Sequence, residues 1–256
     1  MSYTVDVIKV GQSLVPGPEV YWMSHWKDME QLYFYVVLLR GNGKVILINS
    51  GTPDNLSILN EKWEQFIGPE GKMERQPEEK IEAALAARGI TPEQVDYVLI
   101  TPLQAYATAN IPLFKNATIC ISKRGWKEDY HEPVFPLHVE PELRIPPAAL
   151  HYLETHPEKL RLIDDSEEIT PGISAKWVGT HHRSSMAYCI DTAKGMVVVS
   201  DCFFKYGNLE QLQPLGIHES MQECFDAYQW INDNADIAIP LYDPEVLQRY
   251  PAGKVC

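Results

Sequence analysis

One apolar run that stops abruptly constrains this chain more than any other feature. Val98, Leu99 and Ile100 are followed at once by polar residues from Thr101 onward. This pattern predicts a buried strand that opens into a loop, with a helix beginning behind it near Ala105. Because α/β proteins usually place their chemistry on loops at strand ends, we expect this loop to belong to a functional site.

Local patterns predict elements before and after this run. Alternating polar and apolar residues predict an edge strand at 3–10, and strand-forming segments on both sides of Gly41-Asn42-Gly43 predict a hairpin. A strong helix is expected over 77–88, where PEEKIEAALAAR is followed by glycine. An amphipathic helix is expected over 220–234, with five residues on its buried face: Met221, Cys224, Phe225, Tyr228 and Ile231.

Several short apolar segments in the second half predict a further sheet. They are separated by Pro-Gly and Lys-Gly turns, as is typical of short strands. The expected strands of this second sheet are 160–164, 174–178, 186–192 and 196–200, and 236–240 is expected to be the last buried strand.

The composition is that of a soluble globular protein. The 256 residues are 45% hydrophobic and 22% charged, which is enough for a substantial core within one domain spanning 1–256. No run of about 18 apolar residues occurs, so no membrane partner is expected. The start, MSYTVDVIKV, lacks a basic segment followed by an apolar core, so no secretory signal is expected and the predicted location is cytoplasmic.

Charge and cysteine usage argue against two further classes of protein. A net charge of −13 disfavours nucleic-acid binding, which needs clustered Lys and Arg side chains to displace counterions. The five cysteines are widely spaced and include no CxxC pair. Their spacing favours reduced core residues over a disulfide framework.

The strand and loop at 98–107 resemble the metallo-β-lactamase superfamily, and within it the N-acyl homoserine lactonase-like hydrolases. In that branch the strand ends in T-H-x-H-x-D-H, whose His and Asp side chains bind metal, and the same frame here reads TPLQAYA from Thr101. The resemblance implies an α/β fold, the four-layer αββα sandwich. The segment 123–157, which is rich in Pro, His and Glu, is expected to form a helical insert over the mouth of the site, where lid and specificity elements tend to lie.

The metal-binding positions implied by this resemblance hold other residues. Pro102 and Ala107 have no donor atom, Gln104 is a weak zinc ligand, and Tyr106 binds metal only after losing a proton at about pH 10. Asn49 stands where the family usually has an Asp that supports the metal loop. The sequence therefore predicts no binuclear zinc site, no bound metal and no cofactor.

Three more family positions can be matched in the second half of the chain. His181 best matches the next metal-binding His, Asp201 matches the Asp that bridges the two metals, and Tyr242 replaces the last His. Two surviving ligands are too few, because catalytic zinc takes at least three protein ligands. A rebuilt site is an alternative, in which one of three neighbours supplies the third ligand: His182, His25 or His131.

The same residues form a coherent chemical set without metal. His181 and His182 can exchange protons near neutral pH, and Asp201 can orient or charge-stabilise an imidazole. The phenols of Tyr106 and Tyr242 can donate hydrogen bonds to a carbonyl oxygen, the electrophilic task that zinc performs elsewhere. These five residues are the predicted catalytic group.

Four further residues are predicted to bind substrate. Arg183 can hold a carboxylate or an oxyanion, and Gln104 lies on the central loop. His25 and Trp26 lie just before the first core strand, on an aromatic loop where a pocket rim is expected. The apolar and aromatic segment Tyr21–Trp26 could also support a homodimer.

Other interpretations of these residues stay open. Tyr106 and Tyr242 could simply fill the volume left by lost metals, because close packing tolerates few cavities. His181 and Asp201 could be a relic pair that satisfies its own hydrogen bonds. A serine nucleophile would need a nucleophile elbow, which is not present. The candidates for such a serine, beside His182, are Ser184 and Ser185.

The predicted function is metal-independent hydrolysis of a small carbonyl compound, such as a lactone, ester or amide, by acid–base chemistry. One alternative is a non-catalytic protein that binds a small molecule on a hydrolase scaffold. Another is an isomerase or lyase that needs only proton transfer. The expected partner is in every case a small molecule, and the fold does not decide among these activities.

Overall fold

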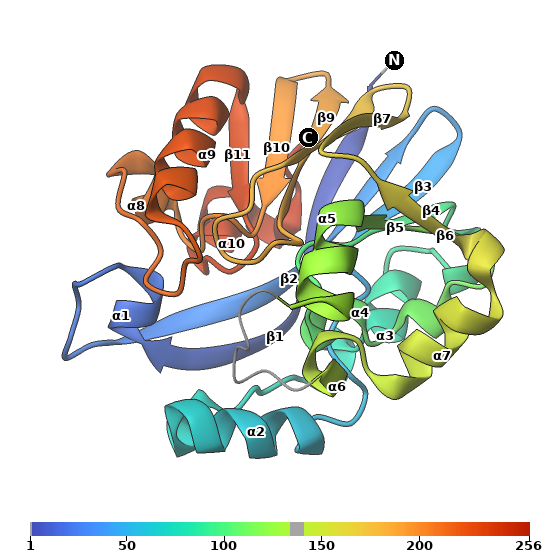
Figure 1. Cartoon of the computed structure of the whole chain (residues 1–256). Helices are drawn as coiled ribbons and strands as arrows, with labels where there is room; N and C mark the ends of the chain where they lie inside the picture. The colour runs from blue at the N-terminus through green and yellow to red at the C-terminus, as the bar shows by residue number, and fades with distance from the viewer. Residues whose placement is uncertain (1, 134–140) are drawn as a thin grey trace.

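Two sheets share one hydrophobic core in the computed structural model, which describes residues 2–133 and 141–256 (Figure 1). The first sheet is six-stranded and its strands follow chain order. They are β1 (Thr4–Pro16), β2 (Met29–Gly41), β3 (Lys44–Ile48), β4 (Tyr97–Leu99), β5 (Thr118–Ser122) and β6 (Leu160–Ile163). β1 is the predicted edge strand, and the predicted hairpin joins β2 to β3.

The second sheet is five-stranded, with the order β11-β10-β9-β8-β7. Its strands are β7 (Ser166–Thr170), β8 (Ile173–Trp177), β9 (Met186–Thr192), β10 (Gly195–Ser200) and β11 (Ile237–Pro240). β11 pairs parallel with β10, whereas β7 to β10 form antiparallel pairs. The strand at β7 was not predicted from the sequence.

The strand predicted at 160–164 exists, but its assignment to the second sheet is wrong. β6 pairs parallel with β5 in the first sheet, with Ile119 opposite Leu160 and Ile121 opposite Leu162. A parallel neighbour can be reached only through a long crossover connection, and the segment between β5 and β6 supplies one. Residues 134–140 of the predicted insert lie outside the described residues.

Helices cover the outer faces of both sheets, as expected for the αββα sandwich (Figure 1). On α9 the buried residues Cys224, Ala227 and Tyr228 pack against Val198 of the second sheet. Ile81 and Leu153 join the core of the first sheet. The helices are α1 (Gly17–Val20), α2 (Ser57–Ile67), α3 (Ile81–Ala86), α4 (Ala105–Thr108), α5 (Lys123–Gly125), α6 (Pro141–Arg144), α7 (Pro147–Thr155), α8 (Tyr206–Glu210), α9 (Met221–Asn234) and α10 (Glu245–Arg249).

Short turns of other helix types complete the chain. A π-helical turn covers Trp126–His131. The 3₁₀ turns are Pro69–Gly71, Pro77–Glu79, Pro92–Gln94, Ile111–Leu113, Pro157–Lys159 and Pro251–Gly253.

Two helices differ in detail from the sequence prediction. The expected helix over 77–88 is broken at Lys80, whose backbone is extended, so that α3 begins only at Ile81. Glu79 forms an ion pair with Lys9 of β1 at 2.9 Å, a tertiary contact that competes with helix propensity. On α9, Phe225 is 39% exposed instead of buried with the other apolar residues.

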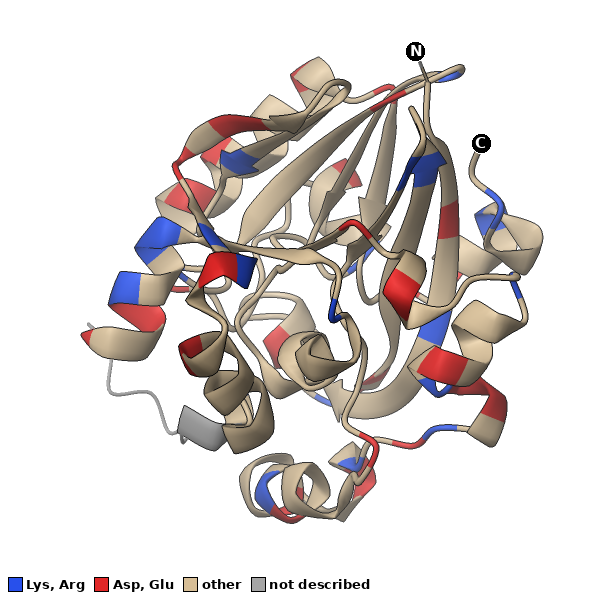
Figure 2. Ribbon diagram, turned by 90° about the vertical axis from the view of Figure 1, so that its right-hand side faces the viewer, with Lys and Arg blue, Asp and Glu red and all other residues tan. Residues whose placement is uncertain are grey.

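Charged residues lie mostly on the outer elements, and the central strands carry few of them (Figure 2). Within the described ranges, no helix is long and apolar enough to cross a lipid bilayer. All five cysteines are free thiols, and four of them are buried. This agrees with the reduced core residues predicted from their spacing.

Candidate functional site

The loop after β4 is held by a neutral amide. The Asn49 side chain donates a hydrogen bond to the Thr101 carbonyl at 2.8 Å and accepts one from the Thr101 backbone N–H at 2.9 Å. Both residues are buried. Asn49 therefore fixes the position of the loop without adding a charge to it.

Asp201, at the end of β10, is fully buried and bonded to two hydroxyl groups. One carboxylate oxygen accepts a short hydrogen bond from Thr101 Oγ1, and the other accepts one from Ser185 Oγ at 2.5 Å. Burial raises the pKa of Asp201 to about 7, although both hydroxyl donors favour its ionised form. Asp201 thus anchors β10 to the loop after β4 and to the start of β9.

His181 does not share a hydrogen bond with Asp201 among the described contacts. Its Nδ1 lies 3.1 Å from the carbonyl oxygen of Ile217, to which it donates. The ring packs edge-on against Phe204 and lies 3.9 Å, between centroids, from the ring of His182. Burial, helped by His182, lowers the pKa of His181 well below its usual value, so this imidazole is neutral and held in place.

His182 lies between an amide and a carboxylate. Its Nε2 is 3.1 Å from Nε2 of Gln104, which donates to it, so the ring proton sits on Nδ1. That Nδ1 is 3.9 Å from Oε1 of Glu219. Burial, together with the charges of Arg144 and Arg183, lowers the pKa of His182 to about 3. The neutral ring therefore presents an N–H donor toward Glu219.

Glu219, in the loop before α9, is the carboxylate that faces this donor. Burial raises its pKa to about 7, even though Arg183 stabilises the ionised form. The backbone N–H of Glu219 donates to the Thr180 carbonyl at 2.7 Å, which fixes the loop against the turn that carries both histidines. A carboxyl group with a pKa near neutrality can both accept and release a proton at physiological pH.

The turn carrying the histidines has a strained backbone. Gly179 and Thr180 both lie in the left-handed region, with φ of 57° and 73°, and this is uncommon for a β-branched residue. A Cβ at Gly179 would come within 2.4 Å of a carboxylate oxygen of Glu223. Strained turns of this kind cluster at functional sites.

Tyr106 and Tyr242 lie together, as expected for residues at converging strand ends. The Tyr242 hydroxyl donates to the Tyr106 hydroxyl at 3.4 Å. Their rings contact each other and the ring of Phe34, and Tyr242 also contacts Phe204. Burial raises the pKa of both phenols, so both are neutral hydrogen-bond donors within an aromatic cluster that continues through Phe204 to His181.

Solved structures with this arrangement of sheets exist. An N-acyl homoserine lactone hydrolase, with N-hexanoyl-L-homoserine bound at its catalytic metal center, is 16% identical and matches 97% of this chain and 96% of its own with a TM-score of 0.78. The fold is that of the metallo-β-lactamase superfamily.

Two other proteins with this fold are similarly distant in sequence. A probable metal-dependent hydrolase from Staphylococcus aureus is 16% identical, with 94% of this chain and 90% of its own covered and a TM-score of 0.76. A hydrolase of the β-lactamase superfamily is 15% identical, with 99% and 89% covered and a TM-score of 0.66. No family model and no curated protein matches the sequence.

The donor atoms at the family's metal positions do not fit a pair of divalent ions. Pro102 and Ala107 supply none, and the Tyr106 and Tyr242 hydroxyls are protonated and bonded to each other. Both oxygens of Asp201 already accept hydrogen bonds from hydroxyl groups. Zinc would have to displace these contacts and would still lack ligands.

Another set of side chains in the described part of the chain has metal-binding composition. Ligand atoms of Asp129, His182 and Glu219 all lie within 4.8 Å of one another. Asp129 accepts hydrogen bonds from the backbone N–H groups of Ser184 at 2.8 Å and Arg183 at 3.3 Å, and Arg183 also pairs with Glu219. The negative charge of this set is therefore already largely compensated within the protein.

The four predicted substrate-binding residues differ in whether they contact the site histidines. Gln104 contacts His182, as described, but the Arg183 guanidinium is occupied by two carboxylates, with short contacts to Glu219 and Glu223. His25 is paired with Glu30 at 3.0 Å and packs on Tyr21. Trp26 is 65% exposed. Neither His25 nor Trp26 has a contact with the two site histidines among the described contacts.

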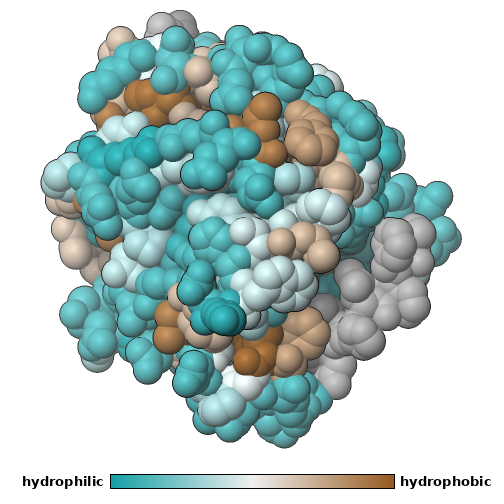
Figure 3. Space-filling model, turned by 90° about the vertical axis from the view of Figure 1, so that its left-hand side faces the viewer, coloured by the Kyte–Doolittle hydropathy of each residue, from teal (hydrophilic) through white to brown (hydrophobic). Residues whose placement is uncertain are grey.

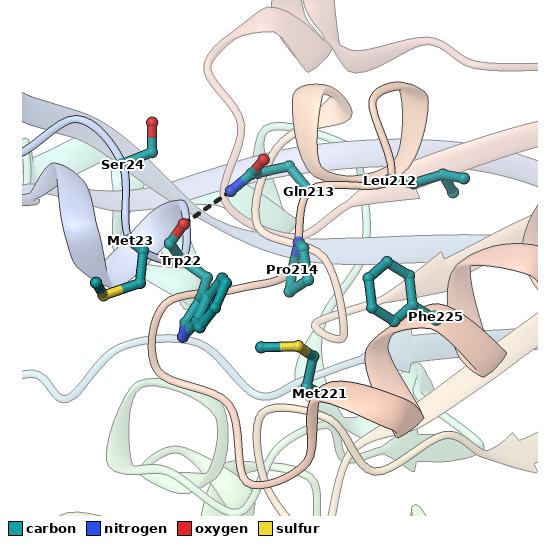
Figure 4. A pocket seen from close by; sticks show the side chains of 8 residues that line it. All are labelled: Trp22, Met23, Ser24, Leu212, Gln213, Pro214, Met221 and Phe225. Carbon is teal, nitrogen blue, oxygen red and sulfur yellow. Dashed lines mark hydrogen bonds between the residues drawn. The ribbon is translucent and has the colours of Figure 1, made fainter.

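A surface groove of about 460 Å³ lies between the loop after α1 and the start of α9 (Figure 4). The surrounding face carries small apolar patches divided by hydrophilic residues (Figure 3). The lining residues are Trp22, Met23, Ser24, Leu212, Gln213, Pro214, Met221 and Phe225. None of them is titratable, so the groove offers contact area but no acid–base chemistry. The homodimer suggested for Tyr21–Trp26 stays a prediction.

Sequence analysis missed several residues of the site. Thr101 bonds Asp201, and its signal was its position directly after the apolar run. Ser185, considered from the sequence only as a nucleophile, is the second hydroxyl donor to Asp201. Glu219 comes from the loop before α9 and Asp129 from the π-helical turn Trp126–His131, and neither lies in a readable motif. No pattern in the sequence pointed to either of them.

Proposed function

We propose that this protein hydrolyses a small carbonyl compound, such as a lactone, ester or amide, without a binuclear metal centre. The supporting observation is the pair formed by His182 and Glu219. A neutral imidazole N–H and a carboxyl group with a pKa near 7 face each other at 3.9 Å in a buried setting. One group can donate a hydrogen bond while the other accepts a proton.

The two groups would divide the work of hydrolysis. Glu219, ionised, takes a proton from water as the water oxygen attacks the carbonyl carbon. His182 Nδ1–H donates a hydrogen bond to the carbonyl oxygen, where negative charge develops. Glu219 then returns the proton to the leaving group, so its own charge is restored at the end of the cycle. Gln104 holds the tautomer of His182 that this role requires.

The other predicted catalytic residues take supporting roles in this proposal. His181 packs against His182 and keeps its ring in place. Tyr106 keeps its hydroxyl proton free, because it accepts from Tyr242, and can donate it to a substrate oxygen. Asp201 positions the loop instead of an imidazole. The cytoplasmic location and the absence of a cofactor belong to the same proposal.

The test is turnover of a panel of lactones, esters and amides by the full chain. We expect His182→Gln to lower kcat/KM by about 10²- to 10⁴-fold, the usual contribution of an acid or base. His151→Gln is the matched control, because His151 is exposed on α7, and it should keep wild-type activity. Full activity of the His182 variant would overturn the proposed roles.

A non-catalytic binding protein is a second candidate. The observation that favours it is the packing of Tyr106 and Tyr242 against Phe34, which is typical of structural aromatic residues. Tight binding of a panel compound without turnover would support this function. A product of unchanged mass would instead indicate an isomerase.

A further inference from the structure

Arg144, the last residue of α6, is fixed to the loop that carries Gln104. The Thr108 hydroxyl oxygen lies 2.8 Å from the Arg144 carbonyl oxygen and 3.0 Å from the Gln104 carbonyl oxygen, so its single proton is shared between these two acceptors. α6 also lies against α4 (Figure 1). The Thr108 hydroxyl therefore bridges the backbone of Arg144 and the backbone of Gln104, the residue that contacts His182.

Arg144 is a buried residue, with 6% of its surface exposed. Other arginines near the site are paired, Arg183 with Glu219 and Glu223, and Arg124 with Asp165. Over residues 2–133 and 143–256, whose side chains are described, no hydrogen bond or ion pair of the Arg144 guanidinium is found. A buried charge without a partner is costly to fold.

The field of Arg144 reaches the candidate site. After burial, its charge is the largest influence that lowers the pKa of His182, ahead of that of Arg183. A positive group held near a neutral imidazole is well placed to attract an anion. A guanidinium can bind carboxylate or phosphate oxygens through two parallel N–H donors, which fixes orientation as well as charge.

We propose that Arg144 binds an anionic oxygen group, a carboxylate or a phosphate, carried by the substrate next to the bond that is cleaved. The role predicted for Arg183 thus falls to Arg144, because carboxylates of the protein already occupy Arg183. This inference rests on the proposed function, because the anionic group is taken to belong to the compound that the protein hydrolyses. The anion site itself can be tested at equilibrium, without turnover.

The experiment is calorimetric titration of the full chain with succinate, inorganic phosphate and succinamide. Succinamide is the uncharged match of succinate, and the two anions distinguish a carboxylate site from a phosphate site. We expect at least one anion to bind more tightly than succinamide, and Arg144→Met to weaken it by about ten- to a hundredfold. Arg144→Lys should retain part of the affinity, and the control Arg124→Met should retain all of it.

Thermal unfolding separates this role from a structural one. Without added anion, Arg144→Met should unfold at the wild-type temperature or above it, because the substitution removes a buried charge that no described side chain pairs with. A clear drop in unfolding temperature for both Arg144 variants would show that the side chain has a structural partner, and would overturn the inference. Binding without preference for charge, or no binding at millimolar concentration, would overturn it as well.

The two proposals fail in different ways. Anion binding that depends on Arg144, in a protein that hydrolyses nothing on the panel, would refute the proposed hydrolase and leave the anion site standing. Hydrolysis that depends on His182, together with equal binding of succinate and succinamide, would refute the anion site alone.

Discussion

The carboxylate of Asp201 accepts a hydrogen bond from the Ser185 hydroxyl at 2.5 Å, whereas His181 is bonded to the backbone of Ile217. The aspartate and the histidine that best match family metal ligands are therefore not each other's partners. Asp201 and His181 form their hydrogen bonds with different parts of the structure. Asp201 joins three segments of the fold, and His181 supports its neighbour His182.

Asp201 should make stability depend on pH. Its folded-state pKa of about 7 is above the ordinary value of 3.8, so the unfolded chain loses this proton first as pH rises. The free energy of unfolding should therefore decrease by up to about 1.4 kcal/mol per pH unit between these two values. Urea denaturation from pH 4 to 8 should show a steeper decrease in the wild type than in Asp201→Asn, whose amide can still bond both hydroxyls and in which the raised pKa of Glu219 still contributes.

Glu219 should determine how activity depends on pH. With a pKa of about 7, the carboxyl group becomes an active base only as pH rises through neutrality. We expect kcat/KM to increase about tenfold per pH unit below pH 7 and to level off above it. Glu219→Gln should abolish this increase of kcat/KM with pH, together with most of the activity. An unchanged profile in Glu219→Gln would assign the base to another group.

Metal removal should leave the activity unchanged. Protein purified without added metal is expected to contain far less than one zinc or iron per chain, and a chelator should not slow hydrolysis. The reason is the shortage of free donor atoms at the family positions. Two bound ions whose loss stops turnover would contradict this expectation. A single ion lost in both Asp129→Asn and His182→Gln would place it at the Asp129, His182 and Glu219 set.

The tyrosine pair allows catalysis to be separated from packing. Tyr106→Phe should lower kcat by about 10²-fold if the phenol stabilises a developing oxyanion, and the free energy of unfolding should change by less than about 1.5 kcal/mol, the value of one hydrogen bond. Tyr242→Phe is the matched variant and should affect kcat less, because its proton is already donated to Tyr106. Wild-type kcat values in both variants would show that the two tyrosines only fill space in the core.

Much of the fold follows from local sequence patterns. The run Val98–Ile100 and the glycine turn after β2 identify a strand end and a hairpin, because strand periodicity and turn chemistry are local properties. The frame TPLQAYA placed the chain in its fold despite the low identity to solved structures. Its missing donor atoms also argued against the metal pair, since a side chain without a donor cannot bind metal in any conformation.

The partners of each side chain were decided only by the tertiary structure. Whether β6 joins the first or the second sheet depends on where the crossover returns the chain, and no local pattern contains that information. Sequence proximity put Arg183 beside the histidines, but the fold brought Glu219 and Glu223 to its guanidinium, and no carboxylate among the side chains described, 2–133 and 143–256, pairs with Arg144. Pairing of charges depends on which segments pack together, and the folding of the whole chain determines that packing.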